Sequence, residues 1–502
     1  MTTNASFKEI LRSSSIIGGA SVVNILIGLL RTKVAAVILG PAGVGLIALL
    51  QNVLSLFAAV AGLGIANSAV RQLAQGSMAE DNREIRATRR ALFWGTAFLA
   101  VLGGGSLWLF RSLVAEHVLG DPSQARNVGW LSIGVTFTVI SASQVALLNG
   151  LRRIGDIARV SVYGALIGTV LGVAALLLWR EAGVTAYLIA APFAAVVSGS
   201  IITRRVRLKD AHGSTVAELR TQLLGMLGLG FTLMLVGLTA TLSLLAVRTV
   251  IGKQLGAVAL GEFSAAWMIS MTYIGFVLQA MGTDYYPRLS AVIGDDAAAT
   301  RLVNEQSEVA LLLAGPILLM MQASAPWLVQ LLFSSEFTGA VDVLRWQILG
   351  DVLKIIGWPL GFVILASGSG RLFLTCDALG VVIYSGFVWA GISTIGISSA
   401  GVGFMLMYAA YLPVVYVIAR RKIGFHWAPR VAWSALTLTG AVGLTGLLGD
   451  ASKWTGLLAG TGIAIASACY SIRRLHQLEA LQGIIVPLLN LIARVRGTSV
   501  RP

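Results

Sequence analysis

The sequence predicts an all-α polytopic membrane protein, and three observations carry this prediction. Apolar runs long enough to cross a bilayer recur along the whole 502-residue chain. Charged residues make up only 12% of the chain, roughly half the share found in soluble proteins. Basic residues gather on alternate connections between the runs, as they do in cytoplasmic loops. The sequence therefore favours a membrane-embedded helical bundle over a soluble fold.

The apolar runs predict about fourteen transmembrane helices. The first six fall at 14–39, 43–67, 88–110, 128–149, 159–179 and 184–203. The next six fall at 223–247, 258–283, 308–333, 346–367, 372–396 and 399–419. A final pair falls at 432–449 and 454–472. The basic connection at 204–222 separates the first two sets, which indicates two six-helix lobes.

This division gives four predicted segments. They are an N-terminal lobe at 1–212, a C-terminal lobe at 213–425, two additional helices at 426–474 and a tail at 475–502. The tail has apolar residues at helical spacing and ends in several arginines, which predicts either an amphipathic helix on the cytoplasmic surface or a solvated tail. Most of the 37 Lys and Arg residues lie on the side of the N-terminus, which predicts that both termini are cytoplasmic.

A short pattern recurs in the two predicted lobes. Lys33 is followed by Leu39-Gly40 and then by Gly45. Arg248 is followed by Leu255-Gly256 and then by Gly261. Both copies fall at the turn between the first two helices of a lobe. The recurrence predicts an internal duplication, which is a common plan for transporters with a central site.

Lys354 is the most informative charged residue, because it lies near the middle of the run at 346–367. A charge at that depth costs roughly 2.5–3.5 kcal/mol on insertion scales. Asp351 lies three residues earlier, on the same helical face. Either the two residues neutralise each other as a packing pair, or Lys354 lines a wet cavity that receives an anionic substrate.

Other polar residues at membrane depth are candidates for the same cavity. They are Asn24, Arg31, Lys33, Gln51, Asn52, Gln144, Asn149, Arg248, Asp284 and Asp377. The cations among them suit a phosphate or diphosphate, which needs several positive partners. Snorkelling to the outer headgroups is the alternative for Arg31, Lys33 and Arg248, and an interfacial position is the alternative for Asp377.

The sequence also excludes several classes of function. The chain has no G-x-x-x-x-G-K-[ST] pattern, and its four histidines and two cysteines are too scattered to predict a metal site or a cofactor. The connections on the outer side are short, which argues against an enzyme with an external catalytic module. The net charge of +15 follows from the cytoplasmic loops and does not point to nucleic acid.

Four stretches carry a resemblance to a known family. They are 33–46 with 51–70, 248–290, 333–338 with 346–354, and 401–403 with Tyr408 and Tyr411. In these stretches the chain resembles the O-antigen flippases of the Wzx type, which include the enterobacterial common antigen flippase. These proteins belong to the multidrug/oligosaccharidyl-lipid/polysaccharide exporter (MOP) superfamily.

The resemblance implies two six-helix lobes in a V around a central cationic cavity that opens alternately to each side. The implied substrate is an O-antigen or related polysaccharide repeat unit on undecaprenyl diphosphate, moved from the cytoplasmic to the periplasmic leaflet of the bacterial inner membrane during lipopolysaccharide synthesis. The implied cavity residues are Arg31, Lys33, Arg248, Asp351 and Lys354. Besides membrane lipids, the implied partners are a polysaccharide polymerase and chain-length machinery.

Because no ATP motif exists, a proton or sodium gradient is the expected driving force, with Asp351 and Asp377 as candidate coupling residues. A lipid II flippase is the nearest alternative, because the last two predicted helices exceed the usual twelve. A drug/cation antiporter of the same superfamily would need an acidic cavity. A membrane-embedded glycan polymerase or ligase is disfavoured by the short external connections.

Overall fold

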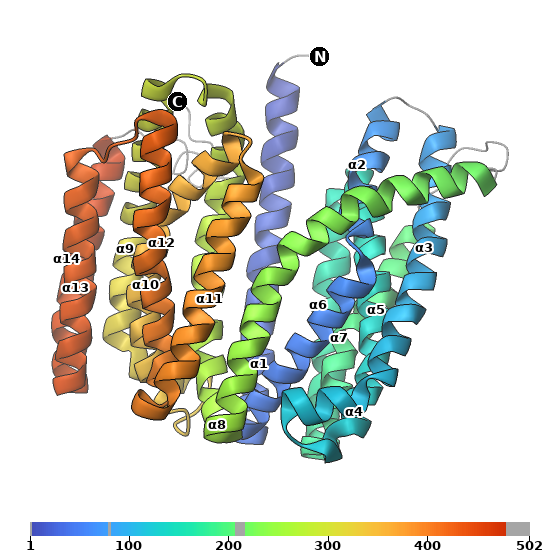
Figure 1. Cartoon of the computed structure of the whole chain (residues 1–502), viewed down its shortest axis with the longest axis horizontal. Helices are drawn as coiled ribbons and strands as arrows, with labels where there is room; N and C mark the ends of the chain where they lie inside the picture. Colours follow the sequence, from blue (N-terminus) through green and yellow to red (C-terminus); the bar gives the residue numbers. More distant parts are fainter. Residues whose placement is uncertain (1–2, 79–81, 206–215, 478–502) are drawn as a thin grey trace, which may run out of the picture. The chain divides into compact units, whose positions relative to one another are not determined.

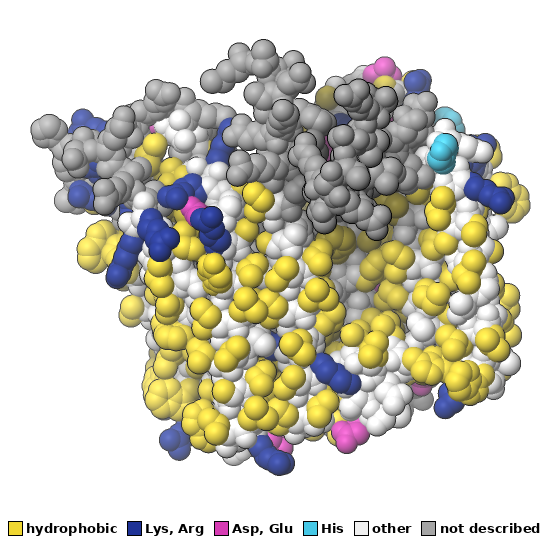
Figure 2. Space-filling model, turned by 180° about the vertical axis from the view of Figure 1, so that it is seen from behind, with side chains coloured by type: hydrophobic (Ala, Val, Ile, Leu, Met, Phe, Trp, Pro, Cys, Tyr) yellow, Lys and Arg dark blue, Asp and Glu magenta, His cyan; other side chains and the backbone are white. Residues whose placement is uncertain are grey.

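The chain is an α-helical membrane protein in the computed structural model, which describes residues 3–78, 82–205 and 216–477. Every regular element within these ranges is a helix (Figure 1). Within the described residues, eleven helical segments are long and apolar enough to cross a membrane. Figure 2 shows hydrophobic side chains across the middle of the visible face, while most charged side chains gather near its upper and lower edges. The predicted all-α polytopic fold is confirmed.

Three of the eleven segments each overlap two of the predicted helices. Gly18–Gly62 has 45 residues, Ile154–Arg204 has 51 and Gly237–Gln279 has 43. Each contains a break, at Gly40, at Arg180–Gly183 and at Gly256 respectively. Each break falls between two predicted helices, so the apolar pattern located these boundaries correctly. The total of fourteen crossings stays a prediction.

The chain divides into two compact units, and the first comprises Met1–Ala265, Gln330–Gly339 and Val388–Ile397. Its elements before α8 are α1 (Thr3–Gly62), α2 (Ile65–Met78), α3 (Asn82–Leu109), α4 (Arg111–Val114), the π-helix η1 (Ala115–Leu119), the 3-10 turn η2 (Pro122–Gln124), α5 (Ala125–Gly150), α6 (Ile154–Trp179), the 3-10 turn η3 (Arg180–Gly183) and α7 (Val184–Arg204). Leu54, Leu107 and Leu131 are buried in its core. The helix α8 (Val216–Val292) continues from this unit into the second.

The second unit comprises Ala266–Val329, Ala340–Phe387 and Ser398–Pro502. Its remaining helices are α9 (Asp296–Leu332), α10 (Gly339–Ala366), α11 (Gly370–Ile395), α12 (Ser398–Ile423), α13 (Pro429–Ala451) and α14 (Lys453–Gln477). Tyr285, Leu360 and Phe425 are buried in its core. The four predicted segments, with boundaries at 212, 425 and 474, stay a prediction. The predicted tail at 475–502 lies outside the described residues from position 478 onward.

The helices α13 and α14 lie side by side as an antiparallel hairpin (Figure 1). Two ion pairs fasten this hairpin to the rest of the second unit. Arg474 Nε of α14 lies 2.7 Å from Glu308 Oε1 of α9. Arg345 of α10 pairs with Asp450 at the end of α13. Because the pairs engage opposite ends of the hairpin, they fix it along its length and not only at its connection to α12.

The two repeated turns have the same unusual backbone conformation. Gly40 breaks α1 with φ 64° and ψ −169°, and Gly256 breaks α8 with φ 86° and ψ 178°. This region of backbone space is essentially restricted to glycine. The recurring Leu-Gly pattern therefore marks two equivalent kinks, which is the local geometry that an internal duplication requires.

The later glycine of each repeat allows the two turns to contact each other inside the first unit. A Cβ atom added at Gly261 would lie 1.8 Å from the carbonyl oxygen of Pro41. A Cβ atom added at Gly45 would lie 2.6 Å from the carbonyl oxygen of Ala257. Both distances are far below van der Waals contact, so only glycine permits this backbone-to-backbone approach.

Candidate functional site

Lys354 of α10 is surrounded by sulfur and aromatic rings within the second unit. Its Nζ atom lies 3.6 Å from the Sδ atom of Met271. The same atom lies 5.7 Å from the ring centroid of Tyr408 and 5.9 Å from that of Phe404. Ring faces attract a cation by about 0.5–2 kcal/mol, depending on desolvation. These groups surround the ammonium group, and no described carboxylate forms a salt bridge with it.

The carboxylate of Asp351 is hydrogen-bonded to a serine and not to Lys354. Its Oδ2 atom accepts a 2.6 Å hydrogen bond from the hydroxyl of Ser270 on α8, and its buried Oδ1 atom has no hydrogen-bond partner. Within the described residues no salt bridge joins Asp351 to Lys354, although the two interact electrostatically. The shared helical face thus brings the two charges near each other without a direct ion pair.

Asp377 of α11 also acts electrostatically on Lys354. The arrangement therefore contains one cation and two carboxylates from three helices of one unit. We call it the lysine site and define it by Met271, Asp351, Lys354, Asp377, Phe404 and Tyr408. Its net charge depends on how many cations or protons the two carboxylates hold.

A cluster of aromatic rings forms one wall of the lysine site. Trp267 stacks on Tyr384 with ring centroids 6.2 Å apart and contacts Phe404 edge-on at 5.6 Å. Phe404 contacts Tyr408 at 5.1 Å, and Tyr408 contacts Tyr411 at 6.2 Å. Edge-to-face pairs of this kind contribute about 0.5–1.5 kcal/mol each beyond their buried area. The wall therefore places two of its rings, Phe404 and Tyr408, beside the Lys354 ammonium group.

Sequence reasoning on charges missed the neutral members of this site. Ser270, Phe404 and Tyr408 carry no charge and stand in ordinary apolar helices. The one available signal was their position, because Ser270 and Tyr408 fall in stretches that carry the family resemblance and Met271 follows Ser270 directly. Their role emerges only when α8, α10 and α12 come together.

The candidates Asn24 and Arg31 on α1 have partners within the first unit. Asn24 Nδ2 donates a 2.6 Å hydrogen bond to Ser161 Oγ, while its buried Oδ1 atom has no partner. Arg31 donates a 2.5 Å hydrogen bond to the carbonyl of Tyr187 and lies 4.1 Å from the centroid of that ring. Both side chains therefore bind α1 to its neighbours in this structure.

The cations of the two repeats, Lys33 and Arg248, are also bonded to protein oxygens in the first unit. Lys33 Nζ donates to the carbonyl of Gln330 at 3.0 Å and to the carbonyl of Phe333 at 2.5 Å. Arg248 is buried and donates to Asn52 Oδ1 at 2.6 Å. The structure thus brings Asp351, Lys354 and Asp377 to one site, while Asn24, Arg31 and these two cations each have separate partners. Their assignment to a substrate cavity stays a prediction.

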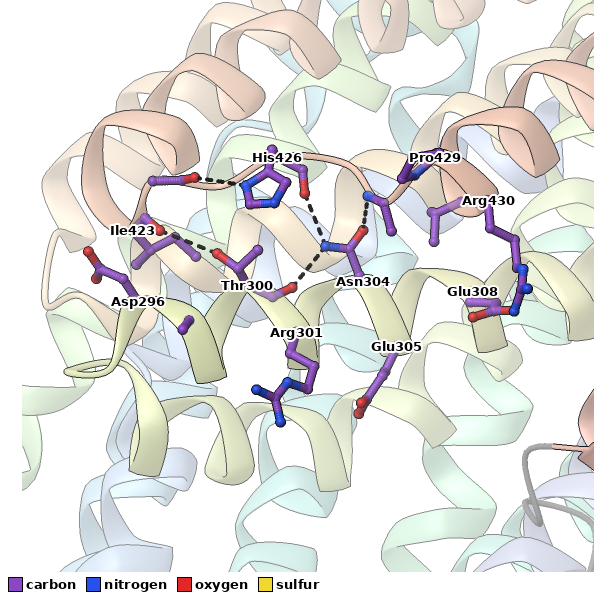
Figure 3. A pocket seen from close by; sticks show the side chains of 14 residues that line it. Asp296, Thr300, Arg301, Asn304, Glu305, Glu308, Ile423, His426, Pro429 and Arg430 are labelled. Carbon is purple, nitrogen blue, oxygen red and sulfur yellow. Dashed lines mark hydrogen bonds between the residues drawn. The ribbon is translucent and has the colours of Figure 1, made fainter.

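A separate cavity of about 850 Å³ lies between the start of α9 and the connection from α12 to α13 (Figure 3). Asn304 holds this connection in place: its Oδ1 atom accepts 2.7 Å from the amide of Ala428, and its Nδ2 atom donates 3.1 Å to the carbonyl of His426. Arg301 and Glu305, of opposite charge, also line the cavity. This mixed lining gives no preference for the charge of a ligand.

The sequence of this chain is similar to those of known proteins. Residues 34–342 match the family described as polysaccharide biosynthesis protein. A lipid III flippase from Escherichia coli strain K12 is 25% identical over 424 residues, which cover 80% of this chain and 97% of that protein. A lipid III flippase from Shigella flexneri matches with the same identity and coverage.

Two solved structures show the same fold. An inward-facing multidrug resistance MATE family transporter of the MOP superfamily has a TM-score of 0.68 at 18% identity, covering 80% of this chain and 94% of its own. The lipid II flippase MurJ, in an inward closed conformation, has a TM-score of 0.66 at 10% identity, covering 93% and 99%. The resemblance predicted from the four sequence stretches is confirmed. Since the family match spans more than half of the sequence, this chain belongs to the polysaccharide biosynthesis protein family.

Proposed function

We propose that this chain is a flippase for a lipid-linked oligosaccharide. The substrate is an oligosaccharide on undecaprenyl diphosphate, an O-antigen or related repeat unit, which moves from the cytoplasmic to the periplasmic leaflet of the bacterial inner membrane. A polysaccharide polymerase and its chain-length machinery would then take up the product. The sequence similarity to lipid III flippases over 97% of their length supports this proposal.

The observation that carries the proposal is the state of Lys354. Its half-buried ammonium group is held by sulfur and aromatic rings and has no bonded carboxylate. Keeping such a charge at membrane depth is costly and is rarely found without a functional reason. An ammonium group offers three donors to a phosphate, and a diphosphate would supply the directly bonded anion that Lys354 does not have among the described residues.

Transport by alternating access follows from this chemistry. The diphosphate binds Lys354 while the site is open to the cytoplasm, and the polyprenyl chain remains in the bilayer. Closure of the cytoplasmic side and opening of the periplasmic side then expose the diphosphate to the other leaflet. Release requires only that the site favour the diphosphate less in the second state.

The direct test is translocation by the purified full-length chain in proteoliposomes. The probe is undecaprenyl diphosphate carrying an oligosaccharide, and its arrival in the outer leaflet is read by a membrane-impermeant glycosidase. We expect translocation well above that of protein-free liposomes. Preferential movement of lipid II in the same assay would establish the alternative flippase function, and movement of cationic drugs alone would indicate an antiporter.

An ion gradient should change the translocation rate through the carboxylates of the lysine site. Asp351 has one free carboxylate oxygen in the protein interior, where a bound proton or sodium ion would alter the net charge beside Lys354. We expect an imposed proton or sodium gradient to change the wild-type rate several-fold. In Asp351→Asn the ratio of rates with and without that gradient should fall towards one.

Asp377→Asn provides the comparison within the same site. If Asp351 is the coupling group, Asp377→Asn should retain part of the gradient response, because the second carboxylate only modulates the charge. A wild-type rate that is the same with and without either gradient would contradict the coupling proposal. It would indicate that the protein equilibrates the lipid passively between the leaflets. A full response in Asp351→Asn would move the coupling role to Asp377.

A further inference from the structure

We propose that an uncharged pocket in the first unit, with amide and hydroxyl groups in its wall, binds the sugar residues of the lipid-linked oligosaccharide. This inference rests on the proposed function and assigns the glycan a place in the unit that lacks the lysine site. The pocket is formed by α1, α2, α5, α6 and α7, and its volume is about 680 Å³. Pockets that hold small molecules measure roughly 300–1,000 Å³. We call it the amide pocket.

The lining of the amide pocket is mostly apolar, and the polar groups set in it carry no charge. Its amide side chains are Gln51, Asn67 and Asn149, and hydroxyl groups are contributed by residues such as Thr138 and Ser161. None of the described lining residues is Lys, Arg, His, Asp or Glu. Each amide offers two donors and a carbonyl acceptor, which matches the neighbouring hydroxyl groups of a sugar.

The amides of this pocket are largely without protein partners. Within the described residues the side chains of Asn67 and Asn149 make no hydrogen bond, and the side chain of Gln51 makes only a long contact of 3.4 Å with Ser55, four residues along the same helix. Polar groups among transmembrane helices must be satisfied by water or by a ligand, because lipid offers no partner. These side chains therefore present open hydrogen-bonding capacity to the pocket.

Two further groups add to this capacity. Asn24 is tied to the pocket wall through Ser161, and its buried Oδ1 atom has no partner. Pro192, which lies inside α7 and lines the pocket, has no backbone N–H group, so the carbonyl of Leu188 lacks its usual helical donor. The wall thus combines side-chain and backbone groups that pair with hydroxyls.

The chemistry of the lining distinguishes among the parts of the substrate. A diphosphate would find no cation in the amide pocket, and a polyprenyl chain would leave its amides unsatisfied. A cationic drug would find no carboxylate. Among the parts of the substrate, only neutral sugars pair with the amides and hydroxyls and need no charged partner, so the glycan is the portion that fits.

The test compares two lipids that differ only in the glycan. Purified full-length protein in lipid nanodiscs is titrated with undecaprenyl diphosphate carrying an oligosaccharide and with sugar-free undecaprenyl diphosphate. Asn149→Leu and Gln51→Leu replace an amide with an apolar side chain of similar size. We expect each to weaken binding of the glycan-carrying lipid about 5- to 100-fold, because a polar ligand group loses its partner. Binding of the sugar-free lipid should not change.

Gln254→Leu is the matched control, because Gln254 is exposed, lies on α8 and is not part of the pocket. It should leave the binding of both lipids at the wild-type level. Equal weakening of both lipids by the pocket variants, or no weakening of either, would overturn the assignment of the glycan to this pocket. Failure of the wild-type protein to bind either lipid would instead overturn the proposed function, and a thermal unfolding profile shows whether each variant is folded.

Discussion

Replacing Lys354 with alanine is expected to lower the rate of oligosaccharide-lipid translocation roughly 10- to 100-fold. A hydrogen bond to a charged group contributes about 1.5–3 kcal/mol, and this lysine is the only cation in the lysine site. Lys354→Met should have the same effect, because it keeps most of the side-chain volume and removes the charge. Lys354→Arg should retain part of the activity, since a guanidinium group also binds diphosphate. The measurement is the initial rate in proteoliposomes at equal amounts of folded protein.

Lys253→Ala is the control for loss of a positive charge, because Lys253 is exposed and lies outside the lysine site. Its rate should match that of the wild type. Normal translocation by both Lys354→Ala and Lys354→Met would show that the lysine is a packing residue. Because removal of a buried charge relieves a desolvation cost, neither variant is expected to unfold.

Gly261→Ala is expected to destabilise the protein by about 3 kcal/mol or more. The new Cβ atom would be placed 1.8 Å from the carbonyl oxygen of Pro41, and backbone cannot move aside as a flexible side chain can. Overpacking of a well-packed interior typically costs about 1–3 kcal/mol, and a collision with backbone lies at the upper end or beyond. Thermal unfolding in detergent, followed by tryptophan fluorescence, provides the measurement.

Substitutions at two other glycines of α8 distinguish the cost of the steric collision from the cost of backbone strain. At Gly256 an added Cβ atom would meet nothing within 4 Å, so Gly256→Ala isolates the backbone strain at φ 86°, about 1–3 kcal/mol. Gly237 has an ordinary helical conformation and open space around it, so Gly237→Ala should not destabilise the protein. The expected order of destabilisation is Gly261, then Gly256, then Gly237. A stable Gly261→Ala variant would mean that the two repeated turns do not meet in the working protein.

The helical architecture could be predicted because it depends on local properties of the chain. Spanning length and apolar composition determine where a helix can cross a bilayer. The Leu-Gly repeat located the kinks at Gly40 and Gly256 because the required backbone conformation admits almost only glycine. The contact between Gly45 and Gly261 depends on packing between residues far apart in sequence, which the repeat by itself could not reveal.

The candidate site was predictable only in part. Helical periodicity placed Asp351 and Lys354 on one helical face. It could not show that the hydroxyl of Ser270, 81 residues away, donates a hydrogen bond to the carboxylate of Asp351. The aromatic wall around Lys354 likewise forms from helices that are separate in sequence. Asn67 was not predicted, and Asn149 was predicted only as one of several polar groups at membrane depth, because a neutral amide acquires a specific role only when five helices enclose it.

The contact between the two repeated turns also bears on how the chain arose. Before duplication, a six-helix ancestor would have met the same turn on a second polypeptide, forming the isologous contact of a two-fold symmetric homodimer. One mutation of the glycine in such an ancestor would have introduced both collisions at once. Fusion made the two glycines separate genetic positions. The unequal approaches, 1.8 Å at Gly261 and 2.6 Å at Gly45, are the divergence from symmetry that a single-chain descendant is free to accumulate.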